Sequence, residues 1–250
     1  MLTVRYGSLK TRRAAIVGAL ALFSLVAAAA QDRDIILRAE FPVDLQVPPS
    51  AAAFQGVVDP LFVARVPDGD ALAALQAEAR WTFAGMIWGF DYIYTPSDRA
   101  RAIQELFDIS QRSPVAAQVL PLKAVSARLD GTVLLGTVEC YPDAEQRREM
   151  ASWKNSSAAE QGSGSARALQ GGSAATAAAA AVEARREATV VAVREALRAF
   201  LRELTHNKPR EVRGSCALAS APRLFIRDGQ WMASVRIYAR VDEIITYGVY

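Results

Sequence analysis

The chain has 250 residues, of which 52% are hydrophobic and 22% are charged, and its formal net charge is +3. Residues 1–30 contain four Lys or Arg and no Asp or Glu, so the rest of the chain carries a formal charge of −1. A chain this close to neutral lacks the basic surface that nucleic acid requires, so nucleic acid is not an expected partner.

Residues 1–30 predict a cleaved signal peptide. A basic region precedes an apolar run over residues 14–26 and four alanines at 27–30, which suit a signal peptidase and make Gln31 the expected first mature residue. The basic residues are Arg5, Lys10, Arg12 and Arg13. An uncleaved anchor is the alternative, but the apolar run is shorter than the roughly 20 residues that span a bilayer. We therefore expect an exported, periplasmic protein without a transmembrane segment in its mature part.

Residues 31–154 predict a first α+β half. "FPVDLQV" at 41–47 alternates apolar and polar residues, which indicates a half-buried strand, and Pro42 within it favours an edge position. A second short strand is expected at 60–66. A helix with one apolar face is expected from Asp70, with Phe90 as the last residue of its apolar pattern.

The remainder of this half begins with an extended "DYIY" at 91–94. A second helix is then expected up to Phe107, with Thr95 as its N-cap and Pro96 in the first helical position. After an extended segment, Asp130-Gly131 predicts the turn of a β-hairpin, because this dipeptide tolerates a positive φ. Residues 142–154 predict a short polar helix.

Residues 155–173 have low complexity, with Leu169 as their only large apolar residue. Such a segment has little apolar surface to offset the entropy cost of ordering, roughly 1–2 kcal/mol per residue. The composition therefore predicts a flexible loop.

Residues 174–250 predict a long helix followed by β-strands. The helix carries an apolar stripe up to Leu204 and is stopped by Asn207 and Pro209. Strands follow at 211–226 and 230–241 around a turn at Asp228-Gly229, and 244–250 is expected as a last strand.

The predicted fold class is α+β, with a mixed or antiparallel sheet shared by the two halves and packed helices. Each half has a helix, an extended strand and a hairpin that turns on Asp-Gly. Their apolar registers drift apart when aligned on the turn, so duplication of a helix-plus-hairpin unit stays open.

The two cysteines, Cys140 and Cys216, both lie in apolar, strand-like runs. An exported protein with two cysteines has one intramolecular pairing available, so a disulfide is one interpretation. Two buried free thiols are the other.

The stretch "WTFAGMIWGFDYIYTP" at 81–96 is the densest aromatic segment. Its amphipathic rings are candidate binding residues that could stack on sugars or on a partner's apolar surface. These are Trp81, Trp88, Tyr92 and Tyr94. The competing interpretation, which we favour, is that they fill the core between helix and sheet.

Residues 81–109, with "FAGMIWGFDYIYTPSDRAR" followed by "ELFDI", resemble a group of uncharacterised exported proteins of spirochaetes. The resemblance implies no catalytic residues, because that group supplies no catalytic motif to transfer. The rest of the chain is loosely similar to small periplasmic and lipoprotein modules that act by binding.

Catalytic signatures are scarce. One histidine, His206, and two cysteines in unmatched spacing do not supply a metal site, and no nucleotide- or cofactor-binding motif occurs. Asp91 and Asp98 flank the aromatic stretch, so a cell-wall glycoside hydrolase with this carboxylate pair is the alternative function.

We expect a non-enzymatic exported protein that binds a protein or another envelope component, or has a structural role there, and that uses no cofactor. A binding module should show an exposed apolar patch, whereas a wall hydrolase should show a carboxylate-lined groove.

Overall fold

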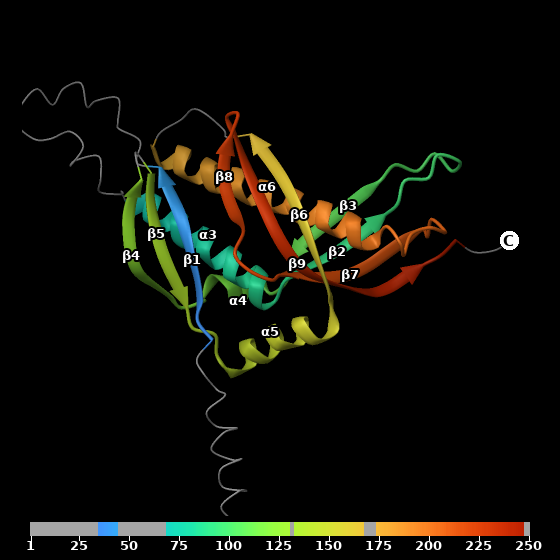
Figure 1. Cartoon of the computed structure of the whole chain (residues 1–250), viewed down its shortest axis with the longest axis horizontal. Coiled ribbons are helices and arrows are strands. Elements are labelled where there is room, and N and C mark those ends of the chain that lie inside the picture. Colours follow the sequence, from blue (N-terminus) through green and yellow to red (C-terminus); the bar gives the residue numbers. More distant parts are fainter. Residues whose placement is uncertain (1–34, 45–68, 131–132, 168–173, 248–250) are drawn as a thin grey trace, which may run out of the picture. The chain divides into compact units, whose positions relative to one another are not determined.

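The computed structural model describes residues 35–44, 69–130, 133–167 and 174–247. Within these ranges, helices pack on two antiparallel sheets, which confirms the α+β class (Figure 1). The expected signal peptide at 1–30 and the expected strand at 60–66 lie outside the described residues.

The smaller sheet has the order β1-β5-β4. Its strands are β1 (Leu37–Asp44), β5 (Val133–Cys140) and β4 (Leu122–Asp130). Among the described strands, β1 pairs with β5 alone, which confirms the edge position predicted from Pro42. The strand begins at Leu37, four residues before the predicted start at Phe41. Strands β4 and β5 form the hairpin predicted at Asp130-Gly131, with Asp130 opposite Val133.

The larger sheet has the order β3-β2-β7-β9-β6, and β8 pairs with β9. Its strands are β3 (Leu106–Gln111), β2 (Phe90–Thr95), β7 (Glu211–Leu218), β9 (Gln230–Ile245), β6 (Ala158–Arg167) and β8 (Arg223–Arg227). Asp228 and Gly229 have φ angles of 52° and 72°, as the predicted two-residue hairpin turn requires. The described part of the expected last strand, up to Ile245, is a continuation of β9.

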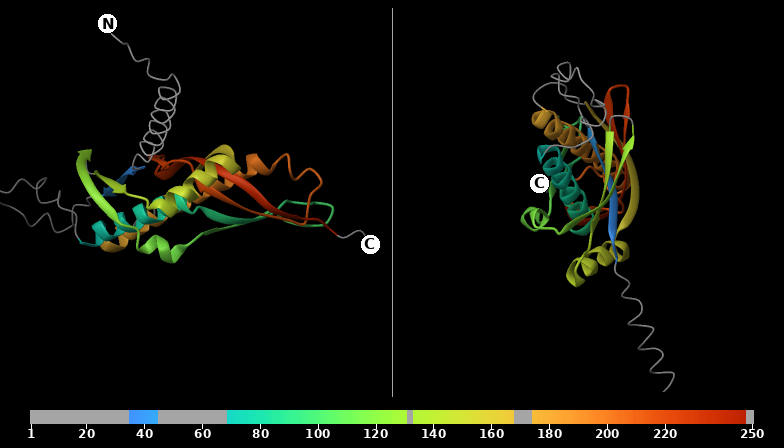
Figure 2. Two further views of the ribbon diagram at one scale, coloured as in Figure 1. Left: turned by 90° about the horizontal axis from the view of Figure 1, so that it is seen from below. Right: turned by 90° about the vertical axis from the view of Figure 1, so that its left-hand side faces the viewer.

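Helices α3 (Gly69–Ile87) and α6 (Ala174–Leu201) lie on the same side of the strands (Figure 2). The buried face of α3, which includes Phe83 and Ile87, joins the core of the smaller sheet. The buried face of α6, with Ala192 and Leu197, joins a second core against the larger sheet. The apolar periodicity correctly placed Phe83 and Leu197 on these buried faces, but Phe90 belongs to β2, and Leu204 lies beyond the end of α6 and is 43% exposed.

Helix α5 (Ala144–Ser156) confirms the predicted polar helix, and α4 (Pro114–Gln118) is one short turn in a segment expected to be extended. Asp143 caps α5 by accepting from the amides of Glu145 and Gln146. Trp153 is 1% exposed, and its indole N–H donates to the Ile87 carbonyl at 3.0 Å. This bond anchors α5 to the end of α3.

The prediction of a flexible loop at 155–173 is wrong for its described part. Residues 158–167 form β6, which pairs with β9 along its whole length, and residues 168–173 lie outside the described ranges. A Cβ atom on Gly162 would lie 2.6 Å from the Ala196 amide nitrogen, and one on Gly164 would lie 2.6 Å from the Ala188 carbonyl oxygen. The small residues are there because the backbones of β6 and α6 touch, not because the segment lacks order.

The helix predicted from Thr95 to Phe107 is also wrong. Asp98 and Ile103 exchange backbone hydrogen bonds of 3.0 and 2.9 Å, which close a turn, and Ala102 has a positive φ of 55°. The chain then returns as β3 beside β2. Pairing of the aromatic and apolar residues of β3 against β2 overrides the local helix-start signal.

The two hairpins that suggested similar halves lie in different sheets. Hairpin β4–β5 belongs to the smaller sheet and β8–β9 to the larger one. Within the larger sheet, β2 and β3 of the first half pair onto β7 of the second. None of the described helices has the length and apolar character needed to cross a membrane.

Candidate functional site

Two of the four predicted binding aromatics lie in the core. Tyr92 is 1% exposed and donates its hydroxyl hydrogen to the Arg240 carbonyl at 3.0 Å. Tyr94 is 8% exposed, and its ring stacks on Phe107 with centroids 4.3 Å apart. Neither ring leaves a face open to a ligand.

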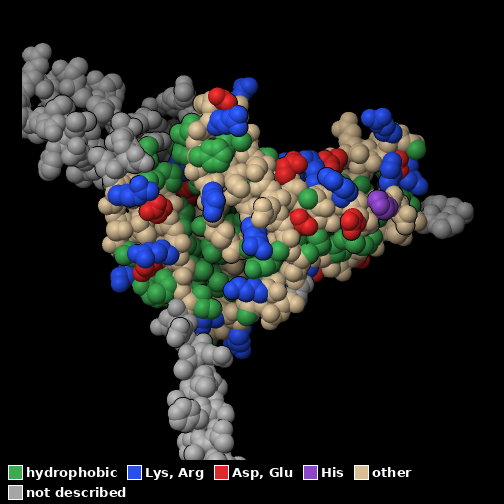
Figure 3. All heavy atoms as spheres, in the orientation of Figure 1, with side chains coloured by type: hydrophobic (Ala, Val, Ile, Leu, Met, Phe, Trp, Pro, Cys, Tyr) green, Lys and Arg blue, Asp and Glu red, His purple; other side chains and the backbone are tan. Residues whose placement is uncertain are grey.

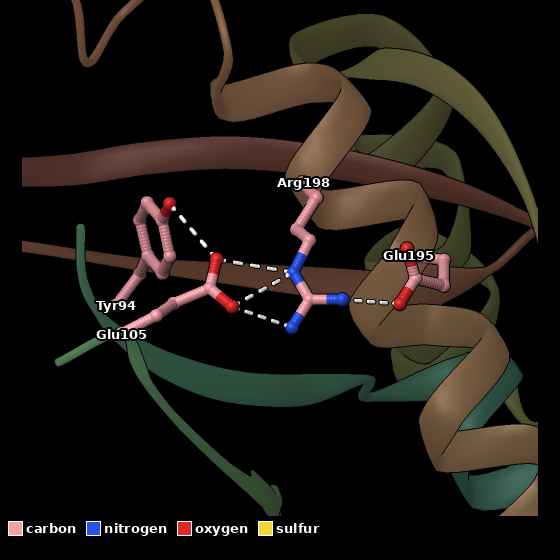
Figure 4. Close-up of polar contacts among 4 residues, drawn as sticks. All are labelled: Tyr94, Glu105, Glu195 and Arg198. Atoms are coloured by element: carbon pink, nitrogen blue, oxygen red, sulfur yellow. Dashed lines mark hydrogen bonds and ion pairs between the residues drawn. The ribbon is translucent and has the colours of Figure 1, made fainter. Parts of the chain in front are cut away.

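Figure 4 shows the polar end of Tyr94 in a network that joins β2 to α6. The Tyr94 hydroxyl donates to Glu105 at 3.2 Å, and Arg198 donates to the same carboxylate and to Glu195. Burial, with a further contribution from the Glu105 carboxylate, raises the pKa of Tyr94 to about 12. We interpret this network as structural, linking β2 to α6, because each of its charged groups already has a partner within it.

The other two aromatics, Trp81 and Trp88, are half-buried and contact different neighbours. The Trp81 ring lies 5.4 Å from Phe90, and Arg186 lies over it at 5.8 Å. Trp88 lines a polar pocket of about 280 Å³ with Arg112, Ser113, Glu145 and Glu149. The four predicted residues therefore do not form one binding surface.

The carboxylates of the alternative hydrolase are both in ion pairs. Asp91 lies 3.1 Å from Arg112. Asp98 accepts from Arg101 and from the Ala100 amide, and Lys208 lies 3.6 Å away. The hydrogen bond from Arg101 lowers the pKa of Asp98, whereas a general acid in glycoside hydrolysis needs a raised pKa.

Of the two interpretations of the cysteines, the structure supports two buried free thiols and not a disulfide. Cys140 and Cys216 are both free and buried, and they belong to the two different hydrophobic cores. Burial raises the pKa of Cys140 to about 11 and that of Cys216 to about 12. The described residues contain no cluster of three or more His, Cys, Asp or Glu that could hold a metal ion.

The structure places an apolar site at β8, between β8 and the solvent-facing side of the smaller sheet. We call this cavity of about 620 Å³ the β8 groove. Its lining residues come from β1, β4, β5, β8, the start of β9 and the residue before β8. They are Glu40, Pro42, Arg128, Val133, Leu135, Pro222, Arg223, Leu224, Phe225, Ile226 and Trp231.

The apolar side chains of the β8 groove are open to solvent. Phe225 is 49% exposed and Ile226 is 56% exposed. Figure 3 shows hydrophobic side chains gathered over the smaller sheet and over β8 on the face that it presents. Glu40 and Arg128 pair on the groove wall at 3.1 Å, so the groove is apolar within and charged at its margins.

Sequence reasoning did not single out the β8 groove, although one signal was present. β8 reads "RLFIR", three large apolar residues in a row between two arginines. Such a run does not alternate, so it indicates either a strand buried on both faces or one with an apolar side left uncovered.

The fold and the groove describe an α+β protein with an apolar cavity along a strand edge. A protein-family model matches residues 25–247, and the chain belongs to that family. It is also 25% identical over 186 residues to an uncharacterized protein of Treponema pallidum (strain Nichols), covering 74% of this chain and 73% of that protein. The resemblance to uncharacterised spirochaete proteins is thereby confirmed. No solved structure matches the chain.

Proposed function

We propose that this protein is a non-enzymatic, exported binding protein of the bacterial cell envelope and that the β8 groove holds part of a protein partner. The observation that carries the proposal is the groove itself, with Phe225 and Ile226 about half exposed beside a cavity of about 620 Å³. Large apolar side chains clustered in a concave site, with charges at the margin, are typical of surfaces that bind other proteins.

The lining of the β8 groove fits a peptide segment better than a sugar. Glu40 and Arg128 bind each other on its wall, Arg223 is the other charged lining residue, and the remaining lining residues are mostly aliphatic or aromatic. A sugar requires several free polar groups to replace its water. An apolar peptide side chain gains from burial alone, at roughly 25 cal/mol per Å².

Site-specific photo-crosslinking in the native cell tests the binding role. A photoreactive phenylalanine analogue replaces Phe225 in one strain and Val115 in another; Val115 on α4 is 75% exposed and lies outside the groove. We expect one defined adduct in the envelope fraction from position 225 and none from position 115. No adduct at 225, or the same adducts from both positions, would contradict a specific role for the groove.

Export is tested separately. The protein should be recovered from the periplasmic fraction, and N-terminal sequencing should begin at Gln31. A cytosolic protein that retains Met1 would contradict this part of the proposal.

A further inference from the structure

The outer edge of β8 carries backbone groups that no described strand uses. β8 pairs with β9 alone, and the two-residue turn at Asp228-Gly229 makes Arg227 and Gln230 the closing hydrogen-bonded pair. Arg223, Phe225 and Arg227 therefore direct their N–H and C=O groups toward β9. Leu224 and Ile226 direct theirs outward, along the groove.

An unpaired strand edge is a template for another strand, and proteins usually protect such edges. The outer edge of β1 is interrupted by Pro42, which lacks an N–H, and is flanked by the charged residues Arg38 and Glu40. β8 contains no proline between Arg223 and Arg227 and presents three large apolar residues. Between β1 and β8, β8 is therefore the strand whose outer edge accepts a new neighbour.

Charge decides which neighbour fits. Arg223 has no hydrogen bond or ion pair within the described residues, and Arg227 contacts only the adjacent Asp228 at 3.5 Å, with both side chains mostly exposed. Antiparallel pairing of β8 with β8 of a second copy would place Arg223 opposite Arg227, and like charges opposite each other destabilise a sheet. An acidic residue at each end of the incoming strand would instead pair with an arginine.

We infer that the β8 groove receives an extended partner segment that adds to the outer edge of β8 as a new strand, with apolar residues at its centre and acidic residues at both ends. This inference rests on the proposed function and specifies its partner. Backbone hydrogen bonds to Leu224 and Ile226 supply the pairing, apolar side chains of the segment fill the cavity beside Phe225, and the flanking carboxylates contact Arg223 and Arg227.

Three synthetic nine-residue peptides test the inference by fluorescence anisotropy with the full mature protein. The first has a Val/Phe-rich centre flanked by Glu on both sides, and the second has the same centre flanked by Lys. The third is the acidic peptide with N-methyl groups on the two central amides that would face β8. We expect the acidic peptide to bind at least about tenfold more tightly than the other two, because N-methylation removes two backbone hydrogen bonds and the basic flanks reverse two charge pairs.

The variant Arg223→Glu/Arg227→Glu should invert the preference between the acidic and basic peptides. The matched control is Arg202→Glu/Arg210→Glu, which changes the net charge equally at two exposed arginines after α6. The control should keep the wild-type preference, and circular dichroism should show both variants folded. An unchanged preference in the β8 variant would overturn the charge assignment.

Equal binding of the N-methylated and unmodified acidic peptides would overturn strand addition. The proposed function would still stand if the crosslinked adduct at Phe225 is observed. Absence of peptide binding together with β8-to-β8 crosslinks between two copies would also overturn the inference, with self-association in its place. Absence of both peptide binding and any Phe225 adduct would reject the groove as a binding site.

Discussion

Gly162 of β6 lies against the backbone of α6, so close that a Cβ atom at position 162 would stand 2.6 Å from the Ala196 amide nitrogen and closer still to the Ala192 carbonyl oxygen. Backbone atoms cannot rotate away as a side chain does, so relief would require the helix to move off the sheet. The larger core depends on this contact, because Ala192 and Ala196 are fully buried against β6 and β9.

Gly162→Ala should therefore destabilise the protein. Forcing the added methyl group into this contact should lower the free energy of unfolding by about 1–3 kcal/mol or more. The reduced conformational entropy of the unfolded chain offsets only about 0.4–1 kcal/mol of this loss. Urea unfolding followed by circular dichroism measures the difference. The control Ser163→Ala alters an exposed neighbour on the same strand and should stay within about 0.5 kcal/mol of wild type. Equal stability of the two variants would contradict direct backbone contact.

The buried ion pair between Glu78 of α3 and Arg185 of α6 should be costly to break. Arg185 donates to both carboxylate oxygens at 2.8 and 2.6 Å, both side chains are 3% exposed, and the guanidinium lies 4.9 Å from the Trp231 ring. Glu78→Ala leaves an unpaired buried cation and should cost about 3–5 kcal/mol. The double variant Glu78→Met/Arg185→Met removes both charges and should recover most of that loss. Urea unfolding of Glu78→Met, Arg185→Met and the double variant checks this, and a loss in the double variant equal to the sum of the two single losses would argue against coupling.

The buried thiols should make stability fall in alkaline solution. Burial raises the pKa of Cys216 to about 12, so above the unfolded thiol's pKa of about 8.5 the unfolded chain loses its proton while the folded chain keeps it. Each such thiol therefore contributes a fall of about 1.4 kcal/mol per pH unit, starting near pH 9. Cys216→Ala should give a shallower decline between pH 9 and 11 in urea titrations. A parallel decline in both proteins would show that Cys216 ionises equally in the two states.

The same burial predicts chemical protection. Native protein at pH 8 should leave Cys140 and Cys216 unmodified by a thiol reagent, and unfolding under non-reducing conditions should release two reactive thiols. Mass spectrometry after alkylation counts them. If the unfolded protein keeps its unmodified mass after alkylation, the two cysteines are joined by a disulfide.

Asp98 should stabilise the fold at neutral pH and lose this effect in acid. The hydrogen bond from Arg101, assisted by Ala100 and Lys208, lowers its pKa, so its contribution is present above the unfolded carboxyl pKa of about 3.9 and is lost as pH falls through the folded value. Asp98→Asn should be less stable than wild type at pH 7, and the gap should narrow below pH 4. Thermal unfolding across this range is the measurement, and a gap independent of pH would attribute the loss to packing.

The sequence predicted the features that depend on residues close together in the chain, namely the positions of helices and hairpin turns. Apolar periodicity located α3 and α6, and Asp-Gly pairs marked both hairpins. These signals work because the residues that produce them lie within a few positions of one another. The strand predicted at 230–241 likewise exists as part of β9, and its residues from Trp231 to Ala239 alternate in burial.

Only the tertiary structure decided the rest. β6 looked unable to order itself because its own side chains bury little, and its order comes from β9 on one side and α6 above it, both distant in sequence. Tyr92 and Tyr94 were candidate binding residues until the sheet buried them, and the two cysteines were separated by their assignment to different cores. The β8 groove exists because β8 pairs on one edge only and faces the smaller sheet on the other. Sequence alone specifies how apolar a strand is, whereas which of its edges and faces stay uncovered depends on the packing of elements far along the chain.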